Sequence, residues 1–331
     1  MKPIIAITVG DFNGIGPEIA LKAATHSGIR KICTPLLVGP LSVFEHTQKS
    51  LKIKSTLEKV VFPWKKTSTP VVDVGDGIWA DVQFGKVTKA SGRNAGLAIE
   101  KAVELCKTGR ADAMVTAPVS KEALNLAGYN FPGQTEMIAL LSRSQRVAMM
   151  LVSDQMRVGL VTIHTALRNA ADNITKEKII EKVSIVNDAL KYNYLMESPR
   201  IAVLALNPHA GEKGLIGKEE QEVIIPALNE LKKSGMAIEG PFSADAFFGT
   251  QSFKAYDAIV AMYHDQGLIP LKMSSFGKGV NFSAGLNMIR TSPDHGTAYD
   301  IAGKGKANIS SMVEAIKLAV KFCSNTLKPN A

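Results

Sequence analysis

The chain contains little cysteine: three residues among 331, at Cys33, Cys106 and Cys323. They lie far apart in the sequence and show no paired spacing. This scarcity argues against a disulfide framework and against a zinc site built from cysteines. It favours a reducing compartment, and we expect the protein to be cytoplasmic.

Long apolar segments are also missing from the sequence. No apolar run approaches the roughly 18 residues that a membrane-spanning helix requires. The first apolar run, IIAITVG, is short and stops before Asp11, so we expect it to form a first strand and not a signal peptide. No membrane partner is therefore expected.

A basic tail is absent, although the chain carries a formal net charge of +9. Its 39 lysines and arginines are scattered, mostly over the faces of predicted helices, with no basic stripe interleaved with aromatic residues. We expect no nucleic-acid partner for this reason. The positive balance fits small acidic ligands better, phosphates in particular.

Short apolar runs alternate with amphipathic helical stretches along the chain. The runs VGLVTIH, RIAVLALN and YDAIVAMYH are nearly continuous, which is typical of strands buried on both faces. Helical stretches such as TKEKIIEKVSIVNDALKY separate them. The alternation predicts an α/β fold with a largely parallel sheet, divided into two lobes. The stretch from roughly residue 45 to 90 is less regular, and we expect extended, hairpin-like segments there.

Three of the six histidines follow predicted strands directly: His164, His209 and His264. Ligands collect at the carboxyl ends of parallel strands, and three imidazoles with an open fourth position form a catalytic metal site. A shared divalent metal ion is one interpretation, and three structural histidines that bond backbone groups are the other. Asp245 and Asp265 are candidates for orienting the ligands or for acid–base work, or they are turn and cap residues.

A glycine-rich tract near the end of the chain carries Lys272, Asn281 and Arg290. Glycines let backbone amides approach an anion, and the two cations neutralise it. The tract begins within AMYHDQGLIPLK, residues 261–272, which we expect to be a strand and its exit loop. An anion site is therefore predicted close in sequence to the last of the three histidines.

Two further stretches have both a binding and a structural interpretation. Gln134 and Thr135 open a predicted helix, where free N–H groups bind anions or are capped by side chains. Asp294 and His295 could line a ribose or adenine pocket, or they could form a turn that caps the next helix. GDGIWA, residues 75–80, formally fits a dinucleotide fingerprint, but no helix pattern follows it, so a turn is expected.

Eight strings along the chain occur in the order seen in the PdxA family, the dehydrogenases of pyridoxal phosphate biosynthesis, and the resemblance covers nearly the whole sequence. They are GDFNGIGPE, VTAPVSKEAL, GQTEMIA, TIHTALRNA, LNPHAGEKGLIGKEE, GPFSADAFF, YHDQGLIPLK and GVNFSAGLNMIRTSPDHGTAYDIAGKGKA.

The resemblance implies a two-lobed α/β/α fold similar to isocitrate and isopropylmalate dehydrogenases, which bind NAD without a glycine fingerprint. We expect a first lobe of residues 1–128 plus 281–331. The second lobe, residues 129–280, is expected to carry the metal site and the dimer contact.

The resemblance also implies NAD or NADP as cofactor and one divalent metal ion, zinc, cobalt or magnesium. His164, His209 and His264 would bind that ion in a site shared across a homodimer. The substrate contacts, carried over position by position, are Gln134, Thr135, Lys272, Asn281 and Arg290.

The implied reaction is oxidation of 4-phosphooxy-L-threonine at C3, followed by decarboxylation to 3-amino-2-oxopropyl phosphate. The sequence departs from the family pattern at Phe12 and Asn13, where the family reads GDPAGIGPE, and at Gln134, where it reads GHTE. Glutamine donates a hydrogen bond but adds no charge and moves no proton. A threonate or erythronate phosphate is thus an alternative substrate. An acyl-phosphate transferase and a non-catalytic metal-binding module are the other classes considered.

Overall fold

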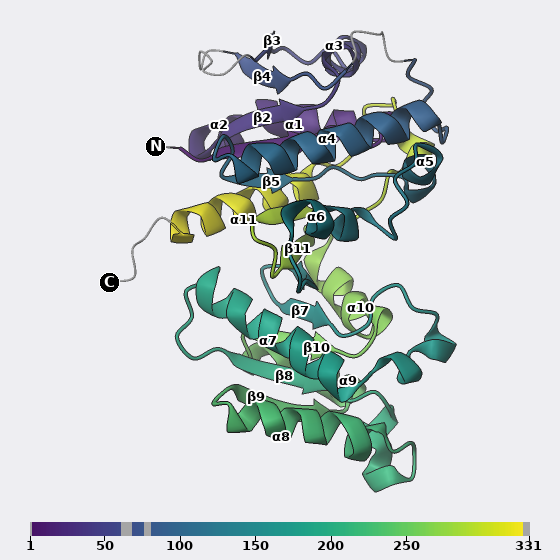
Figure 1. Ribbon diagram of the computed structural model, residues 1–331, viewed down its shortest axis with the longest axis vertical. Coiled ribbons are helices and arrows are strands. Elements are labelled where there is room, and N and C mark those ends of the chain that lie inside the picture. The colour runs from purple at the N-terminus through teal and green to yellow at the C-terminus, as the bar shows by residue number, and fades with distance from the viewer. Residues whose placement is uncertain (1, 61–67, 76–80, 327–331) are drawn as a thin grey trace. The chain divides into compact units, whose positions relative to one another are not determined.

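The computed structural model describes residues 2–60, 68–75 and 81–326 (Figure 1). The described chain divides into two compact units. The first comprises the residues up to Gln145 together with those from Leu286 onward, and the second is Arg146–Gly285. Two lobes were predicted from the sequence, and each is an α/β unit. Residues 76–80 of the GDGIWA motif lie outside the described residues.

The first unit contains a sheet in which neighbouring strands run parallel, in the order β3, β4, β2, β1, β5, β12. Strands β1, β2 and β5 are buried almost throughout, because both faces of the sheet are covered. The bounds are β1 Ile4–Thr8, β2 Thr34–Val38, β3 Leu57–Lys59, β4 Thr69–Val72, β5 Ala113–Val115 and β12 Arg290–Pro293.

Helices cover both faces of this sheet. Helix α1 contacts α2 and α11, whereas α4 contacts α5 and α6, and both groups contact the strands. Right-handed crossovers place the two groups on opposite faces, because β1 to β2 and β4 to β5 advance in opposite directions along the sheet. The bounds are α1 Gly16–Thr25, α2 Ser27–Ile32, α3 Leu41–Ser50, α4 Lys89–Lys107, α5 Lys121–Leu126, α6 Gln134–Ser142, η6 Tyr299–Ile301 and α11 Ser310–Thr326.

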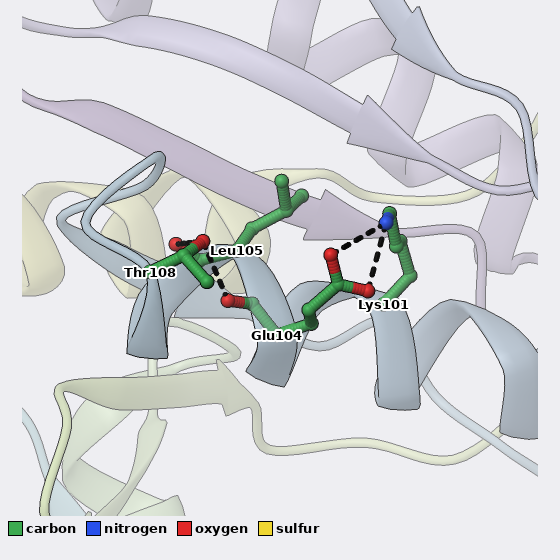
Figure 2. Close-up of polar contacts among 4 residues, drawn as sticks. All are labelled: Lys101, Glu104, Leu105 and Thr108. Carbon is green, nitrogen blue, oxygen red and sulfur yellow. Dashed lines mark hydrogen bonds and ion pairs between the residues drawn. The ribbon is translucent and has the colours of Figure 1, made fainter.

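Helix α4 packs closely on α5 at Gly92. A Cβ atom at this position would stand 1.8 Å from the carbonyl oxygen of Ala123, so no side chain fits there. Figure 2 shows the last turns of α4, where Lys101 Nζ lies 2.8 Å from both carboxylate oxygens of Glu104. The Thr108 hydroxyl donates to the carbonyl oxygen of Glu104 at 2.9 Å, and the N–H of Thr108 donates to the same oxygen at 3.0 Å.

The second unit contains a mixed sheet in the order β11, β6, β7, β10, β8, β9. β6 is antiparallel to both β11 and β7, and the remaining pairs are parallel. The prediction of an α/β fold with largely parallel sheets is confirmed. The bounds are β6 Ala148–Val152, β7 Arg157–Leu160, β8 Arg200–Leu204, β9 Ala237–Phe242, β10 Ala258–Ala261 and β11 Val280–Ala284.

Helices α7 and α8 contact each other and strands of the second sheet, and α10 contacts β7 and β10. Leu268 and Leu271 of α10 join Val158 and Ile259 of the strands in one buried apolar cluster. The bounds are η1 Leu167–Asn169, η2 Ala171–Asn173, α7 Lys176–Tyr192, η3 Pro208–Gly214, η4 Glu220–Ile224, α8 Ile225–Lys233, α9 Ala244–Gly249, η5 Ser252–Ala255 and α10 His264–Ser275.

Three details differ from the expectations. Helix α6 lies in the first unit because it packs on α4, and strand β11 lies in the second because it pairs with β6. The lobe boundaries expected at 128/129 and 280/281 therefore do not coincide with the observed division. Strands β3 and β4 pair in parallel, so the hairpin expected between residues 45 and 90 is wrong for them. Residues 264–275 form helix α10 and not an exit loop.

The three cysteines are free thiols in the first unit. Burial raises the pKa of each to about 12, and the charge of Cys323 contributes at both Cys33 and Cys106. Cys323 therefore lies near both Cys33 and Cys106 in the fold, although the three are far apart in the sequence. Among the helices of residues 2–60, 68–75 and 81–326, none is both long and apolar enough to cross a membrane.

Candidate functional site

Arg290 opens strand β12 and is fully buried. Its Nε and Nη2 donate to the Thr116 hydroxyl at 3.1 and 2.6 Å, and Nη1 donates to the Thr135 hydroxyl at 3.3 Å. Burial lowers the pKa of the guanidinium to about 10, against an opposing effect of Glu136, so the group is charged at neutral pH. A fixed guanidinium of this kind suits a phosphate or a carboxylate.

Gln134 and Thr135 form the first turn of helix α6. The contact between Thr135 and Arg290 brings two of the predicted substrate contacts together. The Oε1 atom of Gln134 is buried and has no hydrogen-bond partner among the described residues. An unsatisfied buried acceptor costs about 1–3 kcal/mol, which a ligand that donates to it would recover.

Asp11 follows strand β1 and is fully buried within a hydrogen-bonded network. The hydroxyls of Ser91 and Tyr299 donate to its Oδ2 at 3.0 and 2.8 Å, and the N–H of Asn13 donates to Oδ1 at 2.8 Å. Burial raises the pKa of the Asp11 carboxyl, and these hydrogen bonds oppose the increase. The side chain therefore links three segments of the first unit.

Asn13, one of the departures from the family pattern, is fully buried in the same region. Its Nδ2 donates to the Lys86 carbonyl at 2.9 Å and to the Thr88 hydroxyl at 3.1 Å, and its Oδ1 accepts from the N–H of Gln83 at 2.7 Å. These contacts tie the first strand–helix turn to residues 83–88. They favour a structural interpretation of that turn.

Asp294 and His295 follow strand β12, at the carboxyl edge of the first sheet. The N–H of Asp294 donates to the Ser311 hydroxyl at 3.0 Å, a contact with the first turn of α11 that favours a structural role. The N–H of Ile15 donates to the Thr297 carbonyl at 2.9 Å and fixes the same loop. The Nε2 atom of His295 is buried and has no partner among the described residues, so it could bond a ligand.

Four adjacent strands of the second sheet are each followed by a candidate residue of the predicted metal site. Strands β7, β10, β8 and β9 run parallel in that order in the sheet. Their carboxyl ends therefore share one edge. In the same order, the residues that follow them are His164, His264, His209 and Asp245.

His164 and His264 lie beside each other, with ring centroids 6.1 Å apart. The chain stays paired beyond both strands, because the N–H of Thr162 donates to the Met262 carbonyl at 3.1 Å. The Nδ1 atom of His264 lies 2.7 Å from Oδ1 of Asp265. A carboxylate on one ring nitrogen orients a histidine and leaves the other nitrogen for a metal ion.

His209 lies in a left-handed turn over residues 209–213, whose φ angles range from 42° to 72°. Four of these residues are not glycine, and each costs roughly 1–2 kcal/mol in this conformation. The Ser243 hydroxyl lowers the pKa of the Asp245 carboxyl through a hydrogen bond, and the charge of the His209 ring contributes to the same effect. His209 and Asp245 are therefore electrostatic neighbours.

Glu220 is a buried carboxylate beside this turn. Its Oε1 accepts from the N–H groups of Leu206 and Asn207, both at 2.8 Å, and its Oε2 accepts from the Asn207 side-chain amide at 2.9 Å. A Cβ atom on Gly211, which has a φ of +72°, would stand 2.5 Å from Oε2. Glycine therefore suits that position, both for its conformation and for the close contact.

The donor set suits a divalent metal ion of the kind that imidazole prefers, such as zinc or cobalt. His164 and His264 would supply two nitrogens, and His209 follows the next strand of the same edge. In the part of this single chain that the structure describes, no group of three or more histidine, cysteine, aspartate or glutamate side chains is placed to hold a metal ion.

The other two predicted substrate contacts belong to the second unit. Lys272 lies exposed on helix α10, eight residues after His264 on the same helix. Asn281 lies in strand β11, where its Oδ1 is buried without a partner among the described residues. Like Gln134, it presents a buried amide oxygen that a ligand could satisfy.

Comparison with known proteins matches residues 31–319 to the model of the pyridoxal phosphate biosynthetic protein PdxA. The chain belongs to the PdxA family. A relative in the family, the 4-hydroxythreonine-4-phosphate dehydrogenase of Trichlorobacter lovleyi, is 43% identical over 332 residues, 98% of each chain. Another, from Oceanobacillus iheyensis, is provisionally named a D-threonate 4-phosphate dehydrogenase and is 38% identical over 97% of this chain and 98% of its own.

A solved structure of the family is similar over the same extent. The 4-hydroxythreonine-4-phosphate dehydrogenase of Klebsiella pneumoniae superposes with a TM-score of 0.88 at 35% identity. The match covers 97% of this chain and 100% of that one. It supports the fold of both units and the identity of the family.

Sequence reasoning missed several polar residues that this PdxA-family chain uses to hold its candidate groups. Thr116 lies 174 residues from Arg290, and Tyr299 lies 288 residues from Asp11. No local sequence pattern predicts such pairs, because the two partners come together only in the folded chain. Glu220 carried a weak signal, as an acidic residue at the start of a helical stretch just after a predicted site histidine.

Proposed function

We propose that this chain is an NAD- or NADP-dependent, metal-dependent oxidoreductase that acts on 4-hydroxythreonine 4-phosphate. It oxidises the C3 hydroxyl, and the resulting β-keto acid loses carbon dioxide to give 3-amino-2-oxopropyl phosphate. This reaction serves pyridoxal phosphate (vitamin B6) biosynthesis.

One observation carries the proposal. Candidate metal-site residues follow four neighbouring parallel strands in a chain 43% identical, over 98% of its length, to a 4-hydroxythreonine-4-phosphate dehydrogenase. The chemistry of these side chains fits a metal-dependent alcohol oxidation.

The proposed metal ligands are His164, His209 and His264, in a site shared across a homodimer. The neighbouring rings of His164 and His264, 6.1 Å apart, support this assignment. A metal ion held by these histidines would supply polarisation of the hydroxyl, and a bound nicotinamide would supply the hydride acceptor. Asp265 orients His264 through its contact of 2.7 Å, and Asp245 orients His209 or relays the proton.

Substrate binding is proposed for the residues that the resemblance indicates. Arg290 is a buried, fixed positive charge for a phosphate or carboxylate, and its partner Thr135 adds a hydroxyl. The buried amide oxygens of Gln134 and Asn281 accept donors from the ligand, and Lys272 adds a cation. For the cofactor we propose Asp294 and His295, since the buried Nε2 of His295 can bond a ligand group. The enzyme is proposed to act in the cytoplasm.

A threonate or erythronate 4-phosphate is the second candidate substrate. Gln134 favours it, because this position departs from the histidine of the family pattern and lies beside the Arg290 contact residue Thr135. The relative from Oceanobacillus iheyensis supports the same alternative. These substrates differ from the first in carrying a hydroxyl where it carries an amine.

The test is a panel of the three phosphorylated substrates with NAD and with NADP. The purified protein is stripped by a chelator and then restored with zinc, cobalt or magnesium, and reduced nicotinamide is measured by absorbance. We expect reduction with 4-hydroxythreonine 4-phosphate that disappears on chelation and returns with metal. Faster turnover of threonate 4-phosphate would establish the second candidate. Metal binding without reduction of either cofactor would overturn both.

A further inference from the structure

Glu220 has no part in the proposed reaction, yet it is 2% exposed and carries a carboxylate. It is the first residue of η4, directly before helix α8. Burying a carboxylate is unfavourable unless several donors bond to it. The donors that bond to Glu220 lie in the chain just before His209.

Among the described residues, Glu220 accepts three hydrogen bonds, and all come from the segment that connects strand β8 to His209. The N–H groups of Leu206 and Asn207 lie 2.8 Å from Oε1, and the Asn207 side-chain amide lies 2.9 Å from Oε2. Hydrogen bonds to an ionised carboxylate are roughly twice as strong as neutral ones. The carboxylate therefore fixes the chain two and three residues before the histidine.

The same carboxylate also contacts the chain after His209. Gly211 lies against it so closely that a Cβ atom would stand 2.5 Å from Oε2. The N–H of Ile216 donates to the Gly211 carbonyl at 3.1 Å, which fixes the exit of the turn. Glu220 thus touches the chain on both sides of the histidine.

His209 has little else to hold it. Its side chain is exposed, so core packing does not set its rotamer, and its backbone is left-handed with a φ of 52°. Unfavourable backbone conformations persist only where surrounding contacts enforce them. The contacts with Glu220 hold the chain on both sides of this histidine.

We propose that Glu220 is a positioning residue for His209: it holds the left-handed turn and thereby places the imidazole as a ligand for a divalent metal ion. The inference rests on the proposed function, in that it takes His209 as a metal ligand. Glu220 acts through the backbone, in contrast to carboxylates such as Asp265, which contact a histidine ring directly.

The experiment measures metal affinity without turnover. Metal-free, full-length protein is titrated with Co²⁺, and the visible absorption of the bound ion is followed in the absence of nicotinamide and substrate. Glu220→Gln keeps the size of the side chain but removes its charge and directs an NH₂ group at the Asn207 amide. We expect Co²⁺ affinity to fall roughly 10- to 100-fold, the usual effect of losing an outer contact of a metal ligand.

Glu219→Gln is the matched control. Its carboxylate accepts from the same Asn207 amide at 2.7 Å, while the two backbone N–H groups remain bonded to Glu220. We expect less than about a threefold change, because both backbone N–H bonds before His209 remain and a substitution away from such a contact has a small effect. An equal loss of Co²⁺ affinity in both variants would mean that negative charge at this edge of the sheet matters and not the placement of His209. That result would overturn the inference.

A cycle with His209→Ala separates positioning from a general structural role. If Glu220 acts through the histidine, Glu220→Gln weakens Co²⁺ binding in the parent protein but not in the His209→Ala background. The same loss in both backgrounds overturns the inference. Parent-like affinity in Glu220→Gln, together with a loss in His209→Ala, overturns the inference alone. Parent-like affinity in His209→Ala overturns the ligand assignment of the proposed function, and the inference with it.

Gly211→Ala disturbs the same contact from the opposite side and serves if Glu220→Gln does not fold. The added methyl group would meet Glu220 Oε2 without touching any proposed ligand. We expect weaker Co²⁺ binding here as well, with circular dichroism that matches the parent. Unchanged affinity in a folded Gly211→Ala protein would contradict the inference.

Discussion

Arg290 of the first unit is fully buried and bonded to two threonine hydroxyls, whereas His209 of the second unit is exposed on a left-handed turn. The same contrast separates Asp11, enclosed by Ser91 and Tyr299, from the exposed Asp245. At Arg290 and Asp11 of the first unit, the protein itself satisfies the polar group and sets its position.

The polar groups at the edge of the second sheet depend more on what binds them. His164, His209 and Asp265 are all exposed, so few packing contacts hold their side chains. Exposed groups are replaced at little cost in stability, whereas buried and bonded groups are not. Substitutions of the buried groups of the first unit should therefore affect stability and activity together, and those of the exposed groups of the second should affect activity alone.

The largest expected effect is that of His264→Ala. Loss of a proposed metal ligand should lower NADH formation roughly 1,000-fold, because the ion contributes several kcal/mol to the oxidation. The free energy of unfolding of the metal-free protein should change by no more than about 0.5 kcal/mol, since the side chain is partly exposed. Metal analysis, the NADH assay and urea denaturation measure the three quantities. Normal metal content and NADH formation would remove His264 from the metal site.

Arg290→Ala should produce an intermediate effect on activity and a clear effect on stability. We expect the KM for the phosphorylated substrate to rise roughly 100-fold, because hydrogen bonds to a charged group contribute about 1.5–3 kcal/mol. The KM for NAD should change far less. The cavity and the unpaired threonine hydroxyls should lower the free energy of unfolding by about 2 kcal/mol or more. A substitution that raised both KM values equally would place Arg290 outside the substrate site.

The smallest expected effect compares two tyrosine–carboxylate pairs, one in each unit. Tyr299→Phe removes a hydroxyl that donates to buried Asp11 at 2.8 Å, and Tyr256→Phe removes one that donates to exposed Glu239 at 2.8 Å. We expect the free energy of unfolding to fall by about 1 kcal/mol in the first variant and by less than about 0.5 kcal/mol in the second.

The first of these losses should depend on pH. The Tyr299 hydroxyl lowers the pKa of Asp11, so its removal raises the folded-state pKa further while the unfolded value stays unchanged. The loss in free energy of unfolding is present where the Asp11 carboxyl is ionised in the folded parent protein. It disappears where this carboxyl is protonated in the folded and the unfolded state alike. It should be largest at pH values above the raised folded-state pKa of Asp11 and shrink as pH falls through that pKa. A deficit that grows in acid would contradict the assigned hydrogen bond.

Much of the fold could be predicted from the sequence, because buried parallel strands leave a strong local signal. The apolar runs before His164, His209 and His264 marked three strands, and parallel pairing then placed their ends at one edge. Helix α10 was missed because Gly267 and Pro270 read as loop residues. In the structure Gly267 lies against Val158, where a Cβ atom would stand 2.6 Å from that side chain, so the glycine serves close packing.

The contacts that hold the candidate groups could not be predicted, for a physical reason. Asn13 bonds residues 83–88, and Asp11 bonds Tyr299 at the far end of the chain. Side-chain hydrogen bonds have no periodicity, so they leave no pattern in a single sequence. The same limit applies to the left-handed turn of His209, since neither Ala210 nor Lys213 favours that conformation.

The first unit is discontinuous in the sequence, and this affects how it folds while the ribosome makes the chain. Strand β5 ends at Val115, but its parallel partner β12 begins at Arg290, after the whole of Arg146–Gly285. At about 5–20 residues per second, synthesis leaves that edge of β5 unpaired for roughly 10–35 s. The continuous second unit can fold within that interval. The nascent first unit therefore presents an open sheet edge that pairs only when β12 has been made. Until then, this edge is exposed to mispairing with other strands.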